Sequence, residues 1–333
     1  MKKVVTIKDL ARLAGMAPST ISKALNDDPS ISNGTKEKIK ELAMQYGYSP
    51  NQIARSLRTS STMVIGMIVP DSSNLYYATL LKGAQEIFSK AGYSIVIGNT
   101  NENAEEEKKQ IKAMHDLHVA GILATPVDEK NYSGCSTPLV FVSRCSAEYA
   151  HDYYSVITDD YLGGFSAAEH LIKQGKKEIY FLSGPKYISI AYERRRGYMD
   201  CHMKYQVDYS DDRIIYDCLT MEDGYRVFDD INKKNPGIKG IFCSSDNVAI
   251  GVLARARELG LSIPDEVGIV GYDDIEMLKY LDYPLTTIHQ DRARIGAQGA
   301  EILQKLIATN NDNGKHGMVS RTILMPRLVV RAT

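Results

Sequence analysis

The sequence predicts two unlike parts, a small all-α head and a larger α/β body of two doubly wound parallel-sheet lobes. Two observations lead to this fold class. Residues 6–57 contain short amphipathic helical patterns separated by turn residues. From Met63 onward, short apolar strand patterns alternate with amphipathic helical patterns, in two successive series. A chain of 333 residues has room for a head and two domains of roughly 100–150 residues each.

The first helix of the head is predicted to begin after Thr6 and to end at Gly15. Thr6 and Asp9 have the spacing of a capping box, in which a hydroxyl precedes an acid by three residues. Gly15 can stop the helix. The apolar stripe between these ends consists of Ile7, Leu10, Ala11 and Ala14.

A second helix is predicted from Ser19 to Leu25, with Pro18 in its first turn, where a missing N–H costs little. Its inward face comprises Ile21, Ala24 and Leu25. Its outward face carries small polar and cationic side chains, namely Ser19, Thr20, Ser22, Lys23 and Asn26. Two helices joined by a tight Gly-containing turn, the second with such an outer face, form the helix-turn-helix pattern. The pattern predicts a DNA-reading head, followed by a third helix and a brief fourth one.

The charge distribution agrees with a DNA-binding head. Residues 1–60 contain ten basic and five acidic residues, a net charge of +5. The whole chain has 40 basic and 41 acidic residues, which leaves 30 and 36, or −6, for the remainder. A locally basic head is what phosphate neutralisation requires, although a solvated surface of ordinary composition explains the charge alone equally well.

Composition points to an ordinary soluble globular protein, with 44% hydrophobic and 24% charged residues. No apolar run approaches the ~20 residues that span a bilayer, and polar residues interrupt the N-terminal apolar stretch, so no secretory signal is expected. The five cysteines are far apart and form no C-x-x-C pair. They fit reduced thiols and neither a disulfide framework nor a zinc site, so we expect a cytoplasmic protein.

The body is expected to begin with one series of strands and helices and to continue with a second. The first series has strand patterns at 63–70, 93–98, 121–125 and 139–143 and helical patterns at 75–91 and 104–117. The second has strand patterns at 155–158, 178–184, 213–216, 240–245 and 267–274. Its helical patterns lie at 161–174, from about Tyr192, at 221–234 and at 247–259. Such alternation indicates parallel sheets covered by helices on both faces.

The closing segment is long enough to cross back between the lobes, with a strand at 285–288, a helix at 291–308 and a strand-like run at 318–330. We therefore expect a head at 1–49, a hinge and linker at 50–61 and a two-lobed body at 62–333. The first lobe would comprise about 62–160 plus 292–320. The second would comprise about 161–291 plus 321–333.

Ligands of open parallel sheets bind outside the carboxyl ends of the strands, and polar or aromatic residues follow many of these strands. The candidates for a ligand site between the lobes are Asp71, Tyr76, Tyr77, Thr125, Ser143, Arg194, Phe242, Ser245, Asp246 and Asp273. Hydrogen-bonding side chains and aromatic faces together suit a sugar-like ligand. The pattern favours a helix N-cap over a ligand contact for Asp246, and it fits Tyr76 and Tyr77 equally well as core aromatics. For Asp273 it favours ligand binding.

Catalytic motifs are absent from the sequence. It contains no G-x-x-x-x-G-K-[ST] loop, no G-x-G-x-x-G after a strand, no H-E-x-x-H and no G-x-S-x-G elbow. His115 and His118 have a spacing that can hold a metal, but no carboxylate or cysteine cluster completes the site. The sequence therefore predicts a binding protein and not an enzyme, with no metal and no cofactor.

Several segments in this order resemble the lac/galactose repressor (LacI/GalR) family over almost the whole chain. The head carries TIKDLARLAGMAPSTISKALN and NQIARSLRT. The body carries DDYLGGFSAAEHLI (159–172), YERRRGY (192–198) and IPDEVGIVGYDDIEMLKYLDYPLTTIHQD (263–291). The resemblance implies a transcriptional regulator, a repressor, with a body of the periplasmic-binding-protein-like type. It further implies a homodimer bound to a pseudo-palindromic DNA operator.

In the head, the family's base-reading positions fall on Pro18, Ser19 and Lys23 by this resemblance. Its DNA-backbone contacts fall on Thr20, Ser22, Asn26 and Tyr48. Two departures matter. Ala17 replaces the usual Ser or Thr that caps the recognition helix, a cap worth ~1 kcal/mol. Pro18 offers only apolar contact, for example to a thymine methyl group, so base specificity would depend on Ser19 and Lys23.

The hinge segment 51–58 is expected, by the same resemblance, to become helical on DNA and to enter the minor groove. Leu57 matches the family's leucine wedge, which opens a central base step and kinks the duplex. Ala54 permits close approach, and Arg55 and Arg58 can reach the backbone or the groove. Effector binding in the cleft would then control whether two hinges can fold together.

In the cleft, Arg194 and Asp273 match the family's central ligand contacts, and Tyr76 and Tyr77 match its aromatic pair. Ser143 stands where an acid is frequent, so the ligand of the best-known members does not carry over. We expect a carbohydrate effector, with a nucleoside or purine as the alternative. A transporter's solute-binding protein is a second alternative, but it would need an export signal and no basic head.

Overall fold

The computed structural model describes residues 5–25, 27–48, 62–311 and 319–333. The chain divides into two compact units, residues 1–63 and 64–333. The predictions for Asn26 and for the hinge residues Ala54, Arg55, Leu57 and Arg58 fall outside the described residues. Within the described residues, no helix is both long and apolar enough to cross a membrane.

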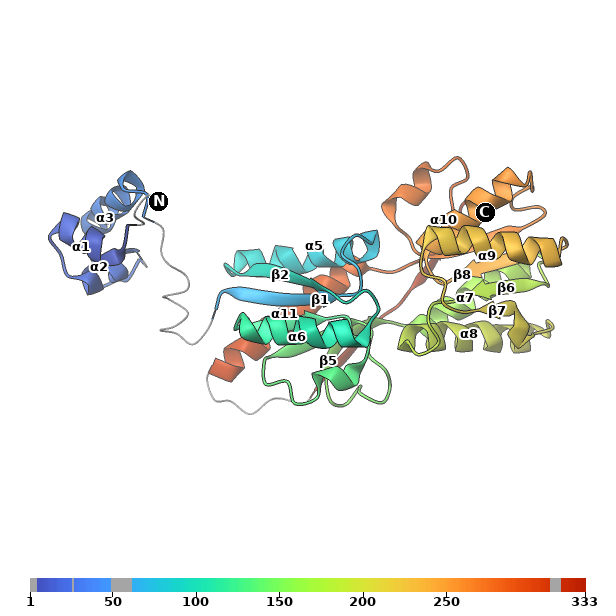
Figure 1. The fold of residues 1–333 in the computed structure, drawn as a ribbon, viewed down its shortest axis with the longest axis horizontal. Helices are drawn as coiled ribbons and strands as arrows, with labels where there is room; N and C mark the ends of the chain where they lie inside the picture. The colour runs from blue at the N-terminus through green and yellow to red at the C-terminus, as the bar shows by residue number, and fades with distance from the viewer. Residues whose placement is uncertain (1–4, 26, 49–61, 312–318) are drawn as a thin grey trace. The chain divides into compact units, whose positions relative to one another are not determined.

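The head consists of α1 (Ile7–Ala14), α2 (Pro18–Leu25) and α3 (Asn33–Gln45) (Figure 1). The capping box is confirmed, because Thr6 and Asp9 cap each other's backbone N–H groups. Gly15 closes α1 in the left-handed conformation with φ 66°. The three helices enclose a small core whose buried members are Leu10, Ala11, Ile21, Ala24, Ile39 and Ala43.

The first sheet of the body has the strand order β11-β5-β4-β3-β1-β2, and all its strands are parallel. Its strands are β1 (Val64–Val69), β2 (Ser94–Asn99), β3 (Gly121–Ala124), β4 (Leu139–Ser143), β5 (Tyr154–Thr158) and β11 (Arg321–Leu324). Its helices are α5 (Leu75–Lys90), α6 (Ala104–Asp116), the short η1 (Glu129–Tyr132) and α11 (Arg292–Asn311). Strands β3 and β4 are buried along their whole length, as expected of parallel strands covered on both faces.

The second sheet has the order β12-β10-β9-β8-β6-β7, parallel except that β12 runs antiparallel to β10. Its strands are β6 (Ile179–Leu182), β7 (Ile214–Ile215), β8 (Gly240–Cys243), β9 (Gly268–Asp273), β10 (Thr286–His289) and β12 (Arg327–Val329). Its helices are α7 (Asp160–Lys173), α8 (Ser189–Tyr205), η2 (Asp211–Arg213), α9 (Met221–Lys234), α10 (Asp246–Glu258) and η3 (Glu276–Tyr280). The predicted fold class, a helical head with a body of two parallel α/β lobes, is confirmed.

Two predicted boundaries were wrong. The run 318–330 is not one strand, because Met325 and Pro326 separate β11 from β12 and the two strands belong to different sheets. Proline has no N–H for a strand ladder, which explains the break. The first lobe therefore extends to Leu324 and not to residue 320. Helix α8 begins at Ser189 and not near Tyr192, so Arg194 lies inside the helix.

Helices α7 and α8 pack so closely that their backbones touch at two glycines. A Cβ atom on Gly164 would lie 2.2 Å from the carbonyl oxygen of Arg194, and one on Gly197 would lie 2.0 Å from that of Tyr161. Asp160 begins α7 and Arg194 lies on α8. The close contact therefore sets the spacing between these two charged side chains.

For Gly164→Ala, we expect a loss of about 1–3 kcal/mol in the free energy of unfolding of the body, because the added methyl group overlaps the backbone of α8. Urea unfolding measures the change. Gly237→Ala is the control, since its Cβ would meet only the Asn235 side chain, at an ordinary 3.5 Å. Equal stability of the two variants would contradict the close packing of α7 on α8.

Candidate functional site

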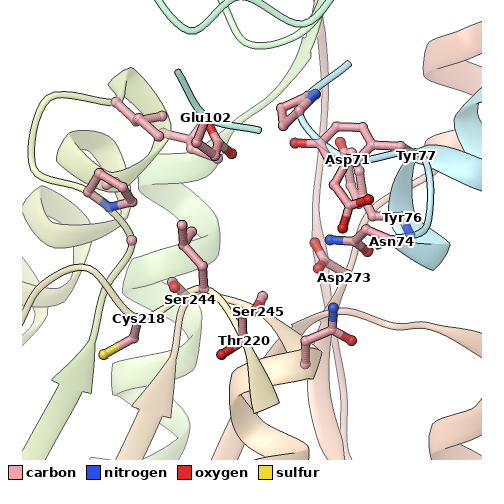
Figure 2. Close-up of a pocket in the computed structure, with 18 of the residues that line it drawn as sticks. Asp71, Asn74, Tyr76, Tyr77, Glu102, Cys218, Thr220, Ser244, Ser245 and Asp273 are labelled. Atoms are coloured by element: carbon pink, nitrogen blue, oxygen red, sulfur yellow. Dashed lines mark hydrogen bonds between the residues drawn. The ribbon is translucent and has the colours of Figure 1, made fainter. Parts of the chain in front are cut away.

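A cavity of about 360 Å³ opens between the carboxyl ends of the two sets of strands. Residues of both sheets line it, and Figure 2 shows Asp71 and Tyr76 opposite Ser244. Of the predicted ligand contacts, the structure brings seven together here: Asp71, Tyr76, Tyr77, Ser143, Arg194, Ser245 and Asp273. This is the edge at which ligands of open parallel sheets bind.

The wall from the first sheet is a chain of side-chain hydrogen bonds around two tyrosines. The Tyr76 hydroxyl donates to Ser143 Oγ at 2.9 Å. The Tyr77 hydroxyl accepts a bond of 3.2 Å from Arg144 Nη2. Arg144 in turn donates to both carboxylate oxygens of Glu102, at 2.8 and 2.7 Å. The two tyrosine rings meet edge to face, with their planes at 82° and their centres 5.0 Å apart.

The wall from the second sheet is organised around Arg194, which is 5% exposed. Its Nε donates to Asp160 Oδ1 at 2.7 Å and its Nη1 donates to the carbonyl oxygen of Ser244. Its guanidinium carbon lies 3.6 Å from the centre of the Tyr272 ring. Among the described residues, no hydrogen bond uses Nη2, so this nitrogen remains able to donate to a ligand in the cavity.

Asp273 ends β9 in the cavity with a φ of 119°, a conformation that L residues rarely adopt. Its Oδ1 accepts one hydrogen bond, of 2.8 Å, from Gln290 Nε2. Burial raises its pKa to about 6, although Arg194 and Arg292 oppose the shift. Ser143, Asn101 and Glu102 also line the cavity with positive φ values, of 70°, 52° and 53°. Backbone strain of this kind gathers at functional sites.

Four helices begin at the cavity. Asn74, Thr220 and Ser245 cap α5, α9 and α10, where each side-chain oxygen accepts a backbone N–H. Helix α8 has Ile188 at its N-cap and no side-chain cap. Its first N–H groups are thus available to an oxygen atom of a ligand.

Three predicted contacts do not line the cavity. Thr125 is fully buried and is not part of the cavity lining. Phe242 stacks on Phe181 in the core, with ring centres 4.5 Å apart. Asp246 accepts hydrogen bonds from Thr287 Oγ1 at 2.6 Å and from the N–H of Ile275 at 2.9 Å, so it holds the β9–η3 turn and does not face the cavity.

Sequence reasoning missed Glu102, Arg144, Asn74, Asn101, Thr220 and Asn247, all of which line the cavity. The sequence held a signal for Arg144, which directly follows the candidate Ser143 at the end of a strand. Glu102 gave none, because it lies in a polar turn after β2 that reads as a solvated loop.

In the head, α2 presents the predicted DNA contacts Pro18, Ser19 and Lys23 as exposed side chains. Thr20 and Ser22 are half-buried, and Tyr48 packs partly against the head core. Ala17 occupies the N-cap position, where its carbonyl oxygen accepts from the N–H groups of Thr20 and Ile21. Its methyl side chain cannot cap the helix.

We expect the substitution Asp273→Asn to stabilise the ligand-free body more at pH 7.5 than at pH 5. The raised pKa means that the folded state holds a proton on Asp273 between about pH 4 and 6 that the unfolded state has released. The wild type therefore loses stability as pH rises through this window, by on the order of 2 kcal/mol, and the amide variant does not. Unfolding in urea at both pH values measures the difference. A difference that is the same at both would contradict the assignment.

The sequence matches a family model for bacterial regulatory proteins of the lacI family over residues 6–51 and one for a periplasmic binding protein-like domain over residues 168–333. It is 30% identical to the HTH-type transcriptional repressor PurR of Vibrio campbellii over 336 residues, covering 99% of this chain and 98% of the relative. The fold matches the Lac repressor dimer bound to operator and the anti-inducer ONPF, with a TM-score of 0.87, 22% identity and 99% of both chains covered. A second similar structure is a periplasmic binding protein/LacI transcriptional regulator of Alkaliphilus metalliredigens complexed with D-xylulofuranose. Its TM-score is 0.70 and its identity 25%, over 82% of this chain and 99% of the other. An exposed recognition-helix face, a two-sheet body and these matches lead to one conclusion: this chain belongs to the lacI family of DNA-binding bacterial transcription regulators.

Proposed function

We propose that this protein is a transcriptional repressor whose affinity for a DNA operator is controlled by a small carbohydrate bound between the lobes of its body. The cavity carries the proposal, because polar side chains from both sheets converge on it. A ligand that contacts both sheets binds one relative arrangement of the lobes better than others. Such differential binding is what lets a ligand shift a two-state equilibrium.

The kinds of side chain in the cavity support a hydroxylated ligand. Asp273 and Asp71 offer carboxylate oxygens, Arg194 Nη2 offers a donor, and Asn247 offers both. Tyr76 and Tyr77 supply aromatic surface. Sugars present many hydroxyl groups that both donate and accept, together with C–H faces that pack on aromatic rings. The complex of the Alkaliphilus regulator with D-xylulofuranose gives this choice a precedent in the same fold.

A nucleoside or purine is the second candidate, favoured by relatives that carry the name PurR. A planar base is best held between two parallel surfaces. The two tyrosine rings, which are nearly perpendicular, do not provide that sandwich. We therefore place carbohydrate first.

Operator binding is assigned to a homodimer with one head per half-site. Ser19 and Lys23 would read bases and Pro18 would make apolar contact. The hydroxyls of Thr20, Ser22 and Tyr48 and the amide of Asn26 would contact the DNA backbone. The hinge residues Ala54, Arg55, Leu57 and Arg58 would enter the minor groove and transmit the state of the body.

The effector class is tested by a thermal-shift screen of the full chain with sugars, sugar phosphates, nucleosides and purine bases. A ligand that binds only the folded body raises its melting temperature by mass action. Protection by a sugar supports the proposal. Protection by a purine or nucleoside and by no sugar would replace carbohydrate with the second candidate.

We expect Asp273→Ala to retain operator binding and to lose the response to the ligand found in that screen, because the cavity loses a central acceptor. Gel shifts on an operator selected from random DNA, with and without the ligand, measure both properties. The matched control is Asp212→Ala, an exposed aspartate of η2 outside the cavity lining. A normal response of the Asp273 variant would remove this residue from the site.

For Lys23→Ala, we expect a loss of about 1–3 kcal/mol in specific operator binding and relaxed sequence preference at one position. Lys23 is exposed on the outer face of α2. Lys38→Ala removes an exposed charge from α3 and should weaken specific and non-specific binding alike, if at all. Indistinguishable effects of the two substitutions would contradict base reading by Lys23.

A further inference from the structure

We infer that the cleft selects an uncharged ligand and excludes phosphorylated and carboxylated ones, and that Glu102 is the residue responsible. This inference rests on the proposed function, since it concerns the same cavity. The proposed ligand is thus restricted to uncharged molecules, and Glu102, which the sequence did not single out, would determine this specificity.

The charged side chains that line the cavity carry a net negative charge. Three carboxylates (Asp71, Glu102 and Asp273) and two guanidinium groups (Arg144 and Arg194) line it. The formal charge of these lining groups is −1, and Asp160 and Arg292, which flank Arg194 and Asp273, add opposite charges. Charges at such sites are screened little by salt, and an anionic ligand would meet net repulsion.

Both arginines of the cavity already form a salt bridge with a carboxylate of the protein. Arg194 has its carboxylate partner in Asp160 at 2.7 Å. Arg144 forms a two-point contact with Glu102 that satisfies both outer nitrogens, and its side chain is only 5% exposed. A two-point contact of this shape is how arginine also binds phosphate and carboxylate ligands. Glu102 therefore occupies the place that an anionic ligand would need.

The backbone conformation that holds Glu102 beside Arg144 is strained. Asn101 and Glu102 are consecutive left-handed residues, and the N–H of Asn101 donates to the carbonyl of Pro70 at 2.8 Å. The carbonyl of Glu102 accepts from the hydroxyl of Tyr187, which comes from the other lobe. Two left-handed non-glycine residues in a row are strained, and the strain is retained where it delivers the Glu102 carboxylate to Arg144.

The helix N-termini at the cavity act against a preference for an uncharged ligand, because the N-terminus of a helix attracts negative charge. The helices concerned are α5, α8, α9 and α10. Three of them already have a side-chain oxygen as cap. The uncapped start of α8 can serve a neutral hydroxyl or carbonyl oxygen as well as an anion. Partial charges at helix ends are smaller than the full carboxylate charges around them, so the net preference remains for an uncharged ligand.

The test uses the full chain and inorganic phosphate, compared with sodium chloride at equal ionic strength by calorimetric titration. In Glu102→Gln, Arg144 loses its carboxylate partner, and we expect phosphate to bind at least tenfold more tightly than to the wild type. The double variant Glu102→Gln/Arg144→Gln should return to the wild-type response, which also subtracts phosphate bound by the DNA-binding head. A folded Glu102→Gln variant without this gain would overturn the inference.

The Glu102→Gln variant leaves a buried arginine unpaired and can fail to fold. In that case the phosphate response of the wild type is compared with that of the double variant, since neither protein contains an unpaired charge at this position. Equal phosphate responses support the inference, whereas a wild-type response that the double variant lacks would show that Arg144 is open to anions. None of these phosphate titrations uses the effector, so their outcome does not depend on the outcome of the sugar screen. In that screen, protection of the wild type by glucose 6-phosphate or galacturonate, but not by glucose or galactose, would also overturn it.

Discussion

The body depends on keeping two arginines inside a cleft, each of them paired with a carboxylate. A buried charge that loses its partner costs several kcal/mol, so each arginine requires its own carboxylate in a fixed position. Arg194 has Asp160, and the pair is possible because two glycines let α7 and α8 touch. Arg144 is paired with Glu102, which lies in a strained turn after the carboxyl end of β2. Helix packing and loop strain thus serve the same electrostatic requirement.

Two buried aspartates close to this cleft differ in the number of hydrogen bonds that the protein gives them. Asp273 and Asp246 both lie in the interior, and burial raises the pKa of each. Asp246 is satisfied by Thr287 and Ile275 and stabilises the turn after β9. Asp273 makes a single hydrogen bond, with Gln290, and keeps acceptor capacity for a ligand. Two aspartates of similar burial therefore differ in the number of protein donors that reach each one, and this difference supports the proposed role of Asp273 in ligand binding.

The sequence predicted the fold well because local signals agree with the global one. Thr6, Asp9 and Gly15 mark a helix by short-range chemistry, and the strand and helix patterns of the body alternate without ambiguity. The site was harder. Thr125, Phe242 and Asp246 lie in or directly after strands, but position along a strand does not say which side chains turn toward the cleft. The pair of Glu102 with Arg144 joins residues 42 positions apart, which no local pattern encodes.

The link between β11 and β12 has a mechanical consequence. Among the described residues, the chain passes between the sheets three times, after β5, after β10 and after β11. The third passage has only Met325 and Pro326 between a strand of one sheet and a strand of the other. Three connections therefore join the lobes, and one of them is only two residues long and contains a proline. A ligand that shifted one lobe against the other would have to bend or twist the body about these connections, because the two-residue link permits little extension.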